Sequence, residues 1–193
     1  MKIIDVITDG ASLLNLTLDQ ATLMGVTQEN EKEVLRENPN IASLFNLLKF
    51  SIRELCTNYV PLSIRRKVNV VNGKYPVALF NNFIRVENVY KDGNPIKYKV
   101  VNRSIILNEN GEYEISYLTY PEIYSMFDEL DFAENLNSDV IVFGLCAYYC
   151  LSHGLFTDFE QFHERYIEKA NSIKTLKIFE IPFRRWWWEL QRK

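Results

Sequence analysis

The sequence predicts an α+β fold: a helical bundle with an inserted antiparallel β-meander or sandwich, followed by an extended C-terminal arm. Apolar residues recur at the three-and-four spacing of helices in the first third of the chain and again after Pro121. Between these parts, β-branched and aromatic residues alternate and are interrupted by turn signals. The predicted organisation is an N-terminal helical segment (1–39), a core (40–173) containing the β insertion (65–120), and an arm (174–193).

Two short helices are predicted in the N-terminal segment. The first starts at Thr17, which has Gln20 three residues later in the pattern of a capping box, and is expected to end at Gly25. The second is polar and Glu-rich, runs from Thr27, and ends before Pro39 because the residue preceding a proline disfavours the helical conformation.

A longer helix is predicted over 40–59, with Asn40 as its cap and Pro61 after its end. Its apolar residues have the spacing of one buried face. They are Ile41, Leu44, Phe45, Leu48, Ile52, Leu55 and Tyr59.

The insertion is expected to contain four or five strands. Asn72-Gly73, the run from Asp92 to Pro95, and the run from Asn108 to Gly111 are strong turn signals. Consecutive strands joined by turns this short pair antiparallel, which predicts a meander.

Two helices are predicted after the insertion. Helix 139–153, with Ser138 as its cap and Gly154 as its stop, is apolar nearly all round and should be buried. Helix 157–172 should begin with a capping box formed by Thr157 and its Glu three residues on. Helix 40–59 is expected to pack against both of them.

The charge is distributed unevenly along the chain. The formal net charge of −3 argues against a dedicated basic nucleic-acid-binding domain. Residues 109–139 carry nine acidic side chains and no Lys or Arg, whereas 49–74 and 174–193 are basic. These regions could pair between copies of the chain or fold together within one copy. The candidate inter-subunit residues are Arg65, Arg66, Lys67, Asp128, Glu129, Asp131 and Glu134.

Little in the sequence indicates catalysis. Cys146, Cys150 and His153 would lie on one helix, where a tetrahedral metal site is strained, so the thiols are interpreted as core side chains. No glycine pattern forms a phosphate-binding loop, and no cofactor is expected. Three cysteines do not form a disulfide framework, and no apolar run approaches the length of a membrane span. A binding or assembly protein is favoured over an enzyme.

The order of these features resembles the head–tail connectors (tail adaptors) of tailed bacteriophages, the group that includes podovirus tail tubular protein A and gatekeeper proteins. The resemblance covers about residues 40–172. The matching residues are Tyr117, Tyr120 and Pro121, the acidic loop 128–139, then Gly144, Ala147, Tyr148 and Leu151, and finally Phe162, Arg165, Tyr166 and Ala170.

The resemblance implies a virion structural protein without enzymatic activity, made in the cytoplasm of the host bacterium. Such adaptors form a ring, typically of twelve copies, beneath the portal protein, and they receive a downstream tail or nozzle protein. The ring extends the DNA channel, and the DNA passes through it without sequence-specific binding. The C-terminal segment of these adaptors docks on the portal.

The end of the chain carries the run RRWWW, which suits such a docking role. Consecutive side chains point in different directions, so one helix or strand face cannot hold all three Trp rings. Trp and Arg are also the residues most enriched at interface hot spots. The candidate partner-binding residues are Phe183, Arg184, Arg185, Trp186, Trp187, Trp188 and Leu190.

Three other interpretations of this run remain open. Arg and Trp together are typical of a peripheral membrane anchor, although Glu180 and Glu189 oppose binding to anionic lipid. Aromatic rings beside Arg also suit an interaction module that binds single-stranded nucleic acid. Finally, the three rings could pack back onto their own domain.

Overall fold

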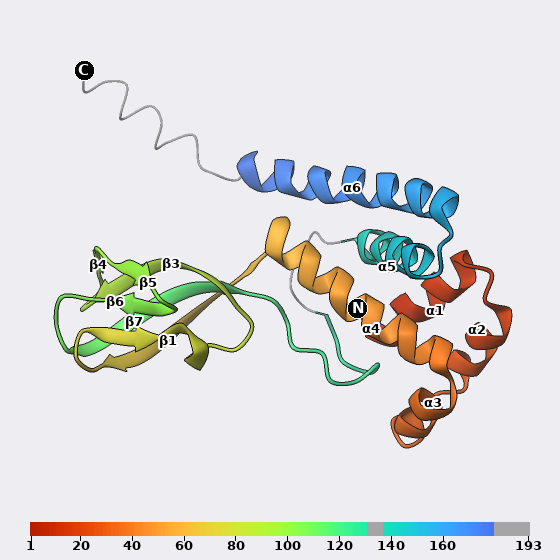
Figure 1. Ribbon diagram of the computed structural model, residues 1–193, viewed down its shortest axis with the longest axis horizontal. Coiled ribbons are helices and arrows are strands. Elements are labelled where there is room, and N and C mark those ends of the chain that lie inside the picture. The colour runs from red at the N-terminus through yellow and green to blue at the C-terminus, as the bar shows by residue number, and fades with distance from the viewer. Residues whose placement is uncertain (131–136, 180–193) are drawn as a thin grey trace. The chain divides into compact units, whose positions relative to one another are not determined.

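The computed structural model describes the backbone of residues 1–130 and 137–179 and the side chains of this part up to Ile173 (Figure 1). It has a mixed α+β fold with N-terminal helices, two antiparallel sheets and C-terminal helices, which confirms the predicted fold class. The chain divides into two compact units. The helical unit contains residues 1–51 and the described residues from 125 onward, and the sheet unit contains residues 52–124.

Four helices precede the strands. They are α1 (Ile3–Leu13), α2 (Thr17–Met24), α3 (Glu31–Glu37) and α4 (Pro39–Asn58). The helix predicted from Thr27 is α3, and it starts later, at Glu31. Thr27 and Asn30 form a turn before it, in which the amide N–H of Thr27 donates to Oδ1 of Asn30 at 2.7 Å.

Two of the N-caps predicted for these four helices are wrong. Thr17 is the first residue of α2, and the capping position is held by Leu16 without a side-chain hydrogen bond. Pro39 is the first residue of α4, where its missing N–H costs nothing because the first helical N–H groups have no intrahelical partner. Asn40 therefore lies inside the helix. Gly25 ends α2 as predicted.

The predicted buried face of α4 is confirmed at every position except one. Tyr59 lies just beyond the helix and is half-buried. The buried members of the face are Ile41, Leu44, Phe45, Leu48, Ile52 and Leu55.

The two helices after the strands are α5 (Ser138–Ser152) and α6 (Phe156–Phe179), which lie side by side (Figure 1). Both bounds of α6 differ from the predicted 157–172. Thr157 is an interior residue of α6 and not its cap. Gly154 follows α5 with a φ of 71°, as expected of the residue that ends a helix in the left-handed conformation.

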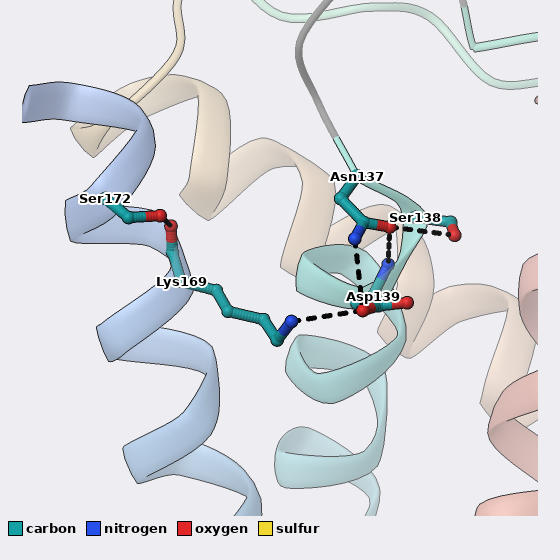
Figure 2. A network of polar contacts seen from close by, with 5 residues as sticks. All are labelled: Asn137, Ser138, Asp139, Lys169 and Ser172. Atoms are coloured by element: carbon teal, nitrogen blue, oxygen red, sulfur yellow. Dashed lines mark hydrogen bonds and ion pairs between the residues drawn. The ribbon is translucent and has the colours of Figure 1, made fainter. Parts of the chain in front are cut away.

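The cap of α5 is Asn137, not the predicted Ser138 (Figure 2). Oδ1 of Asn137 accepts a hydrogen bond from the amide N–H of Asp139 at 3.2 Å, and the side-chain amide of Asn137 donates to Oδ2 of Asp139 at 3.1 Å. The same carboxylate oxygen accepts from Nζ of Lys169 in α6 at 3.0 Å. One side-chain cluster thus caps α5 and links its first turn to α6.

The predicted packing of α4 against the C-terminal helices is confirmed in the helical unit. The rings of Phe50 in α4 and Tyr148 in α5 meet edge to face, with centroids 4.8 Å apart. One turn earlier in α5, Gly144 is flanked by Ser51 of α4 and by the ring of Tyr166 of α6. The absence of a side chain at position 144 lets the three helices come together there.

The sheet unit has seven strands rather than the four or five expected. They are β1 (Leu62–Val70), β2 (Lys74–Pro76), β3 (Phe83–Lys91), β4 (Asn94–Ile96), β5 (Lys99–Val101), β6 (Ser104–Ile106) and β7 (Gly111–Thr119). One sheet has the order β1-β7-β3-β4 and the other the order β2-β6-β5, with a short 3₁₀ helix, Val77–Leu79, after β2.

All strand pairs are antiparallel, as predicted, but the order is not that of a simple meander. The last strand, β7, lies between β1 and β3 and pairs with β1 along all nine residues. The predicted turns at Asn72-Gly73 and Asp92-Gly93 have positive φ at both residues, as short hairpin turns require. A further turn at Asn102-Arg103 also has positive φ at both positions. Arg is an unusual residue for that conformation, so the sequence carried no signal for it.

The core of the sheet unit is formed by apolar side chains on the inner faces of the strands. Phe80 contacts Tyr117 with ring centroids 4.2 Å apart and Tyr75 with centroids 5.2 Å apart. The fully buried members of the core include Val70, Val89, Ile105 and Ile115.

Candidate functional site

The three basic residues predicted to make inter-subunit contacts lie together on β1. Arg65, Arg66 and Lys67 are consecutive and all exposed. In the part of the chain that the structure describes, β1 pairs only with β7, so it is an edge strand of the four-stranded sheet. Successive side chains of a strand point to opposite faces, so Arg66 lies on one face of the sheet and its two neighbours on the other.

The neighbours of this basic triplet are polar. The guanidinium of Arg65 lies 3.8 Å from the carboxylate of Glu114 and stacks 5.2 Å from the ring centre of Tyr90. Nη1 of Arg66 donates to the carbonyl oxygen of Leu79 at 3.0 Å. Exposed ion pairs of this kind contribute about 0–1 kcal/mol, so the triplet is not explained by a large gain in stability.

A hollow of about 290 Å³ adjoins the start of β1, on the face that carries Arg66. Ile64, beside this hollow, is 43% exposed although it lies in a strand. The lining residues are Leu62, Ile64, Arg66, Asn81, Asn82, Tyr117, Thr119, Tyr120, Pro121 and Glu122.

The predicted acidic residues Asp128 and Glu129 lie in the helical unit, in a segment that pairs with the N-terminus. The amide N–H of Ile3 donates to the carbonyl oxygen of Asp128 at 3.1 Å, and that of Leu130 donates to the carbonyl oxygen of Met1 at 2.8 Å. The carboxylate of Asp128 accepts from the amide N–H of Ser125. Glu129 is exposed. The basic triplet and these acidic residues therefore belong to different units.

Sequence reasoning missed the residue that holds this segment. Glu31, at the start of α3, is only 8% exposed. Its carboxylate accepts a hydrogen bond from Oγ of Ser125 and another from the amide N–H of Met126, both at 2.7 Å. Nothing in the Glu-rich sequence around it distinguishes Glu31 from its exposed neighbour Glu33.

The remaining candidate residues lie outside the described part of the chain. They are Asp131 and Glu134 of the acidic stretch, and Phe183, Arg184, Arg185, Trp186, Trp187, Trp188 and Leu190 of the arm.

The cysteines are core side chains, as interpreted from the sequence. Cys56, Cys146 and Cys150 are all buried. Burial, reinforced by the neighbouring Cys150, raises the pKa of the Cys146 thiol to about 12. His153 lies at the end of α5, where its Nδ1 is 2.9 Å from the carbonyl oxygen of Tyr149 and its ring stacks on the Tyr149 ring. In the described ranges, no three His, Cys, Asp or Glu side chains are grouped so that they could hold a metal ion.

The fold and these surfaces define a mixed α+β protein with an exposed basic edge strand. The chain matches no protein-family model and no curated protein. None of the helices in the described residues has the length and apolar character needed to cross a bilayer.

Proposed function

We propose that this chain is a structural protein of a tailed-bacteriophage virion, a head–tail adaptor that forms a ring beneath the portal and joins the capsid vertex to the tail. The observation that carries the proposal is the architecture. A sheet unit, residues 52–124, interrupts the helical unit, whose two parts are residues 1–51 and the described residues from 125 onward. This is the arrangement expected from the adaptor-like order of sequence features.

In this proposal the protein is not an enzyme and has no cofactor. Copies of the chain, twelve in the expected ring, extend the DNA channel, and the DNA passes without sequence-specific binding. The portal protein binds the arm, residues 183–190, and a tail or nozzle protein binds the opposite side of the ring. The protein acts in the neck of the virion and is made in the cytoplasm of the host bacterium.

Exposed apolar side chains of the helical unit support an assembly role. Leu18 and Met24 of α2 are 84% and 79% exposed, and Phe156 at the start of α6 is 64% exposed. Covering such side chains with another chain would remove their apolar surface from water, which is favourable. Basic and acidic regions at different places on one chain also suit head-to-tail contacts, which close into rings when the rotation between subunits permits.

The test is the particle mass of the full chain, alone and with its native assembly, by native mass spectrometry and negative-stain electron microscopy. A ring, or a complex with the portal, is expected. A strictly monomeric protein that never co-purifies with a large complex would overturn the proposal.

Truncation after Ile181 then tests the role of the arm. Loss of the portal complex with an unchanged melting temperature is expected from a docking arm. A lower melting temperature of the isolated chain would instead show that the three Trp rings pack on their own domain. Flotation of the full chain, but not of the truncated chain, with phosphatidylglycerol vesicles would replace the adaptor by a peripheral membrane protein.

A further inference from the structure

The outer edge of β1 is the longest unpaired strand edge in the described residues. β1 is nine residues long and pairs with β7 from Leu62 to Val70. Every second residue of such a strand directs its N–H and C=O groups away from the partner strand. Within the described residues, no hydrogen bond reaches the backbone of β1 from its other side. These groups are available to another strand.

The charge of this edge decides which strand can pair with it. An antiparallel pair of two β1 strands would bring the basic triplets of two copies together, and like charges directly opposite each other are unfavourable. The other described edge strands, β2, β4 and β5, have only three residues each and are too short to pair along β1. Basic side chains on an edge thus discourage self-association while they favour an acidic strand.

The two faces of β1 differ in what they offer a strand added beside it. Arg65 and Lys67 lie on one face, so a neighbouring strand should carry acidic residues there. Ile64 lies on the other face, beside the hollow of about 290 Å³. Leu62, Pro121 and the ring of Tyr117 also line this hollow, so it offers an apolar side chain both room and apolar contacts.

We propose that β1 accepts an extended segment of another protein as an additional strand, in which acidic residues alternate with apolar ones. The acidic side chains lie beside Arg65 and Lys67, and one aliphatic or aromatic side chain fills the hollow beside Ile64. Main-chain hydrogen bonds supply affinity, and the alternate side chains supply selectivity. The inference does not depend on the proposed function, because it rests on the geometry of the sheet unit alone.

The probe is the blocked heptapeptide EVEFEVE, added to the full chain labelled with ¹⁵N, with KVKFKVK as its charge-reversed control. NMR shift changes and slowed amide exchange are expected over Leu62–Val70 with the acidic peptide only. No binding of EVEFEVE, equal binding of both peptides, or changes confined to other strands would overturn the proposal.

Variants separate the two parts of the site. The pair Arg65→Glu and Lys67→Glu should weaken binding about tenfold, because two favourable charge contacts become repulsive. Lys97→Glu with Lys99→Glu makes the same charge change at exposed positions away from this edge and should leave binding unchanged. Ile64→Ala should weaken the Phe-containing peptide but have little effect on EVEAEVE, which keeps the alternation of acidic and apolar residues but has no ring to place in the hollow. Equal effects of Ile64→Ala on both peptides would contradict the role of the hollow.

The same amides report whether a second copy is the occupant instead. Exchange over Leu62–Val70 should not depend on the concentration of the chain alone. Protection that rises with this concentration would show that copies of the chain occupy the edge, and would overturn the proposal. Circular dichroism melting of each variant verifies that it is folded before binding is measured.

Discussion

Gly144 of α5 lies directly against Ser51 of α4, so that a Cβ atom at position 144 would collide with Oγ of Ser51. The Cβ atom added at position 144 would also lie 3.1 Å from Cε2 of Tyr166, whose side chain is fully buried. Glycine is therefore required by space and not by backbone conformation, since the residue lies within a helix.

Gly144→Ala should destabilise the protein by about 2 kcal/mol, because overpacking displaces side chains that have no free space. Urea unfolding followed by circular dichroism measures the change. Gly25→Ala is the matched control, because Gly25 has a φ of −97° and its added Cβ would make only an ordinary contact at 3.5 Å. Equal losses in the two variants would show that the crossing is not tightly packed.

Ser51→Ala should leave the stability unchanged or raise it by up to about 1 kcal/mol. Oγ of Ser51 is buried and has no hydrogen-bond partner among the described residues, so its removal eliminates a desolvated polar group. In the Gly144→Ala background, Ser51→Ala should recover part of the lost stability, because Oγ is one of the two obstacles. A double-mutant cycle measures this coupling, and purely additive changes would contradict the proposed contact.

Glu31→Gln should destabilise the helical unit by about 2 kcal/mol. The substitution removes the charge that accepts hydrogen bonds from Ser125 and Met126, and it can turn an amide donor toward an N–H group. Hydrogen exchange should accelerate at the amide of Met126, which donates to Glu31, and at the amide of Ile4, which donates to the carbonyl oxygen of Met126 at 2.7 Å. Glu33→Gln changes an exposed carboxylate in the same turn and should have an effect near zero. Similar effects of the two variants would rule out an anchoring role of Glu31.

Asn137→Ala should cost about 1 kcal/mol, whereas Ser138→Ala should cost much less. Only Asn137 occupies the capping position and accepts from a free N–H of the first turn. Lys169→Met removes the exposed ion pair with Asp139 and should cost less than about 1 kcal/mol. Thermal unfolding of the three variants gives the ranking. A larger loss for Ser138→Ala than for Asn137→Ala would restore the cap predicted from the sequence.

Alkaline pH should destabilise the protein through Cys146. In the unfolded chain the thiol ionises near the ordinary cysteine pKa of 9.0, but burial raises its pKa in the folded state to about 12. The unfolded state therefore loses its proton first, and stability falls as the pH rises from about 9 to 12, by at most about 1.4 kcal/mol per pH unit. Urea unfolding across this range should have a smaller slope for Cys146→Ala. Identical slopes would show that this thiol does not titrate differently on unfolding.

Much of the fold could be predicted because local patterns determine the type of each element. The buried face of α4 follows from the spacing of its apolar residues, and the turns at Asn72-Gly73 and Asp92-Gly93 follow from residues that tolerate positive φ. Helix caps were predicted less well. Thr17, Asn40, Ser138 and Thr157 all lie within helices, because several neighbouring polar residues can cap and only the local backbone selects one.

The candidate site was predicted only in part. The run of three basic residues is visible in the sequence, but the hollow beside Ile64 and the free edge of β1 depend on which strands pair. The acidic residues Asp128 and Glu129 are visible too, yet the carboxylate that anchors their segment, Glu31, is not distinguished by any local pattern.

The sequence alone established the α+β class, the placement of the strands between two groups of helices, and the uneven charge, because periodicity and turn residues act over a few positions; it did not predict α1 or the number of strands. The tertiary structure was needed to show that β7 lies between β1 and β3, that Glu31 is buried, and that Gly144 meets Ser51. Each of these relationships joins residues far apart in the chain. Their free energy comes from packing and hydrogen bonds that exist only after the chain has folded.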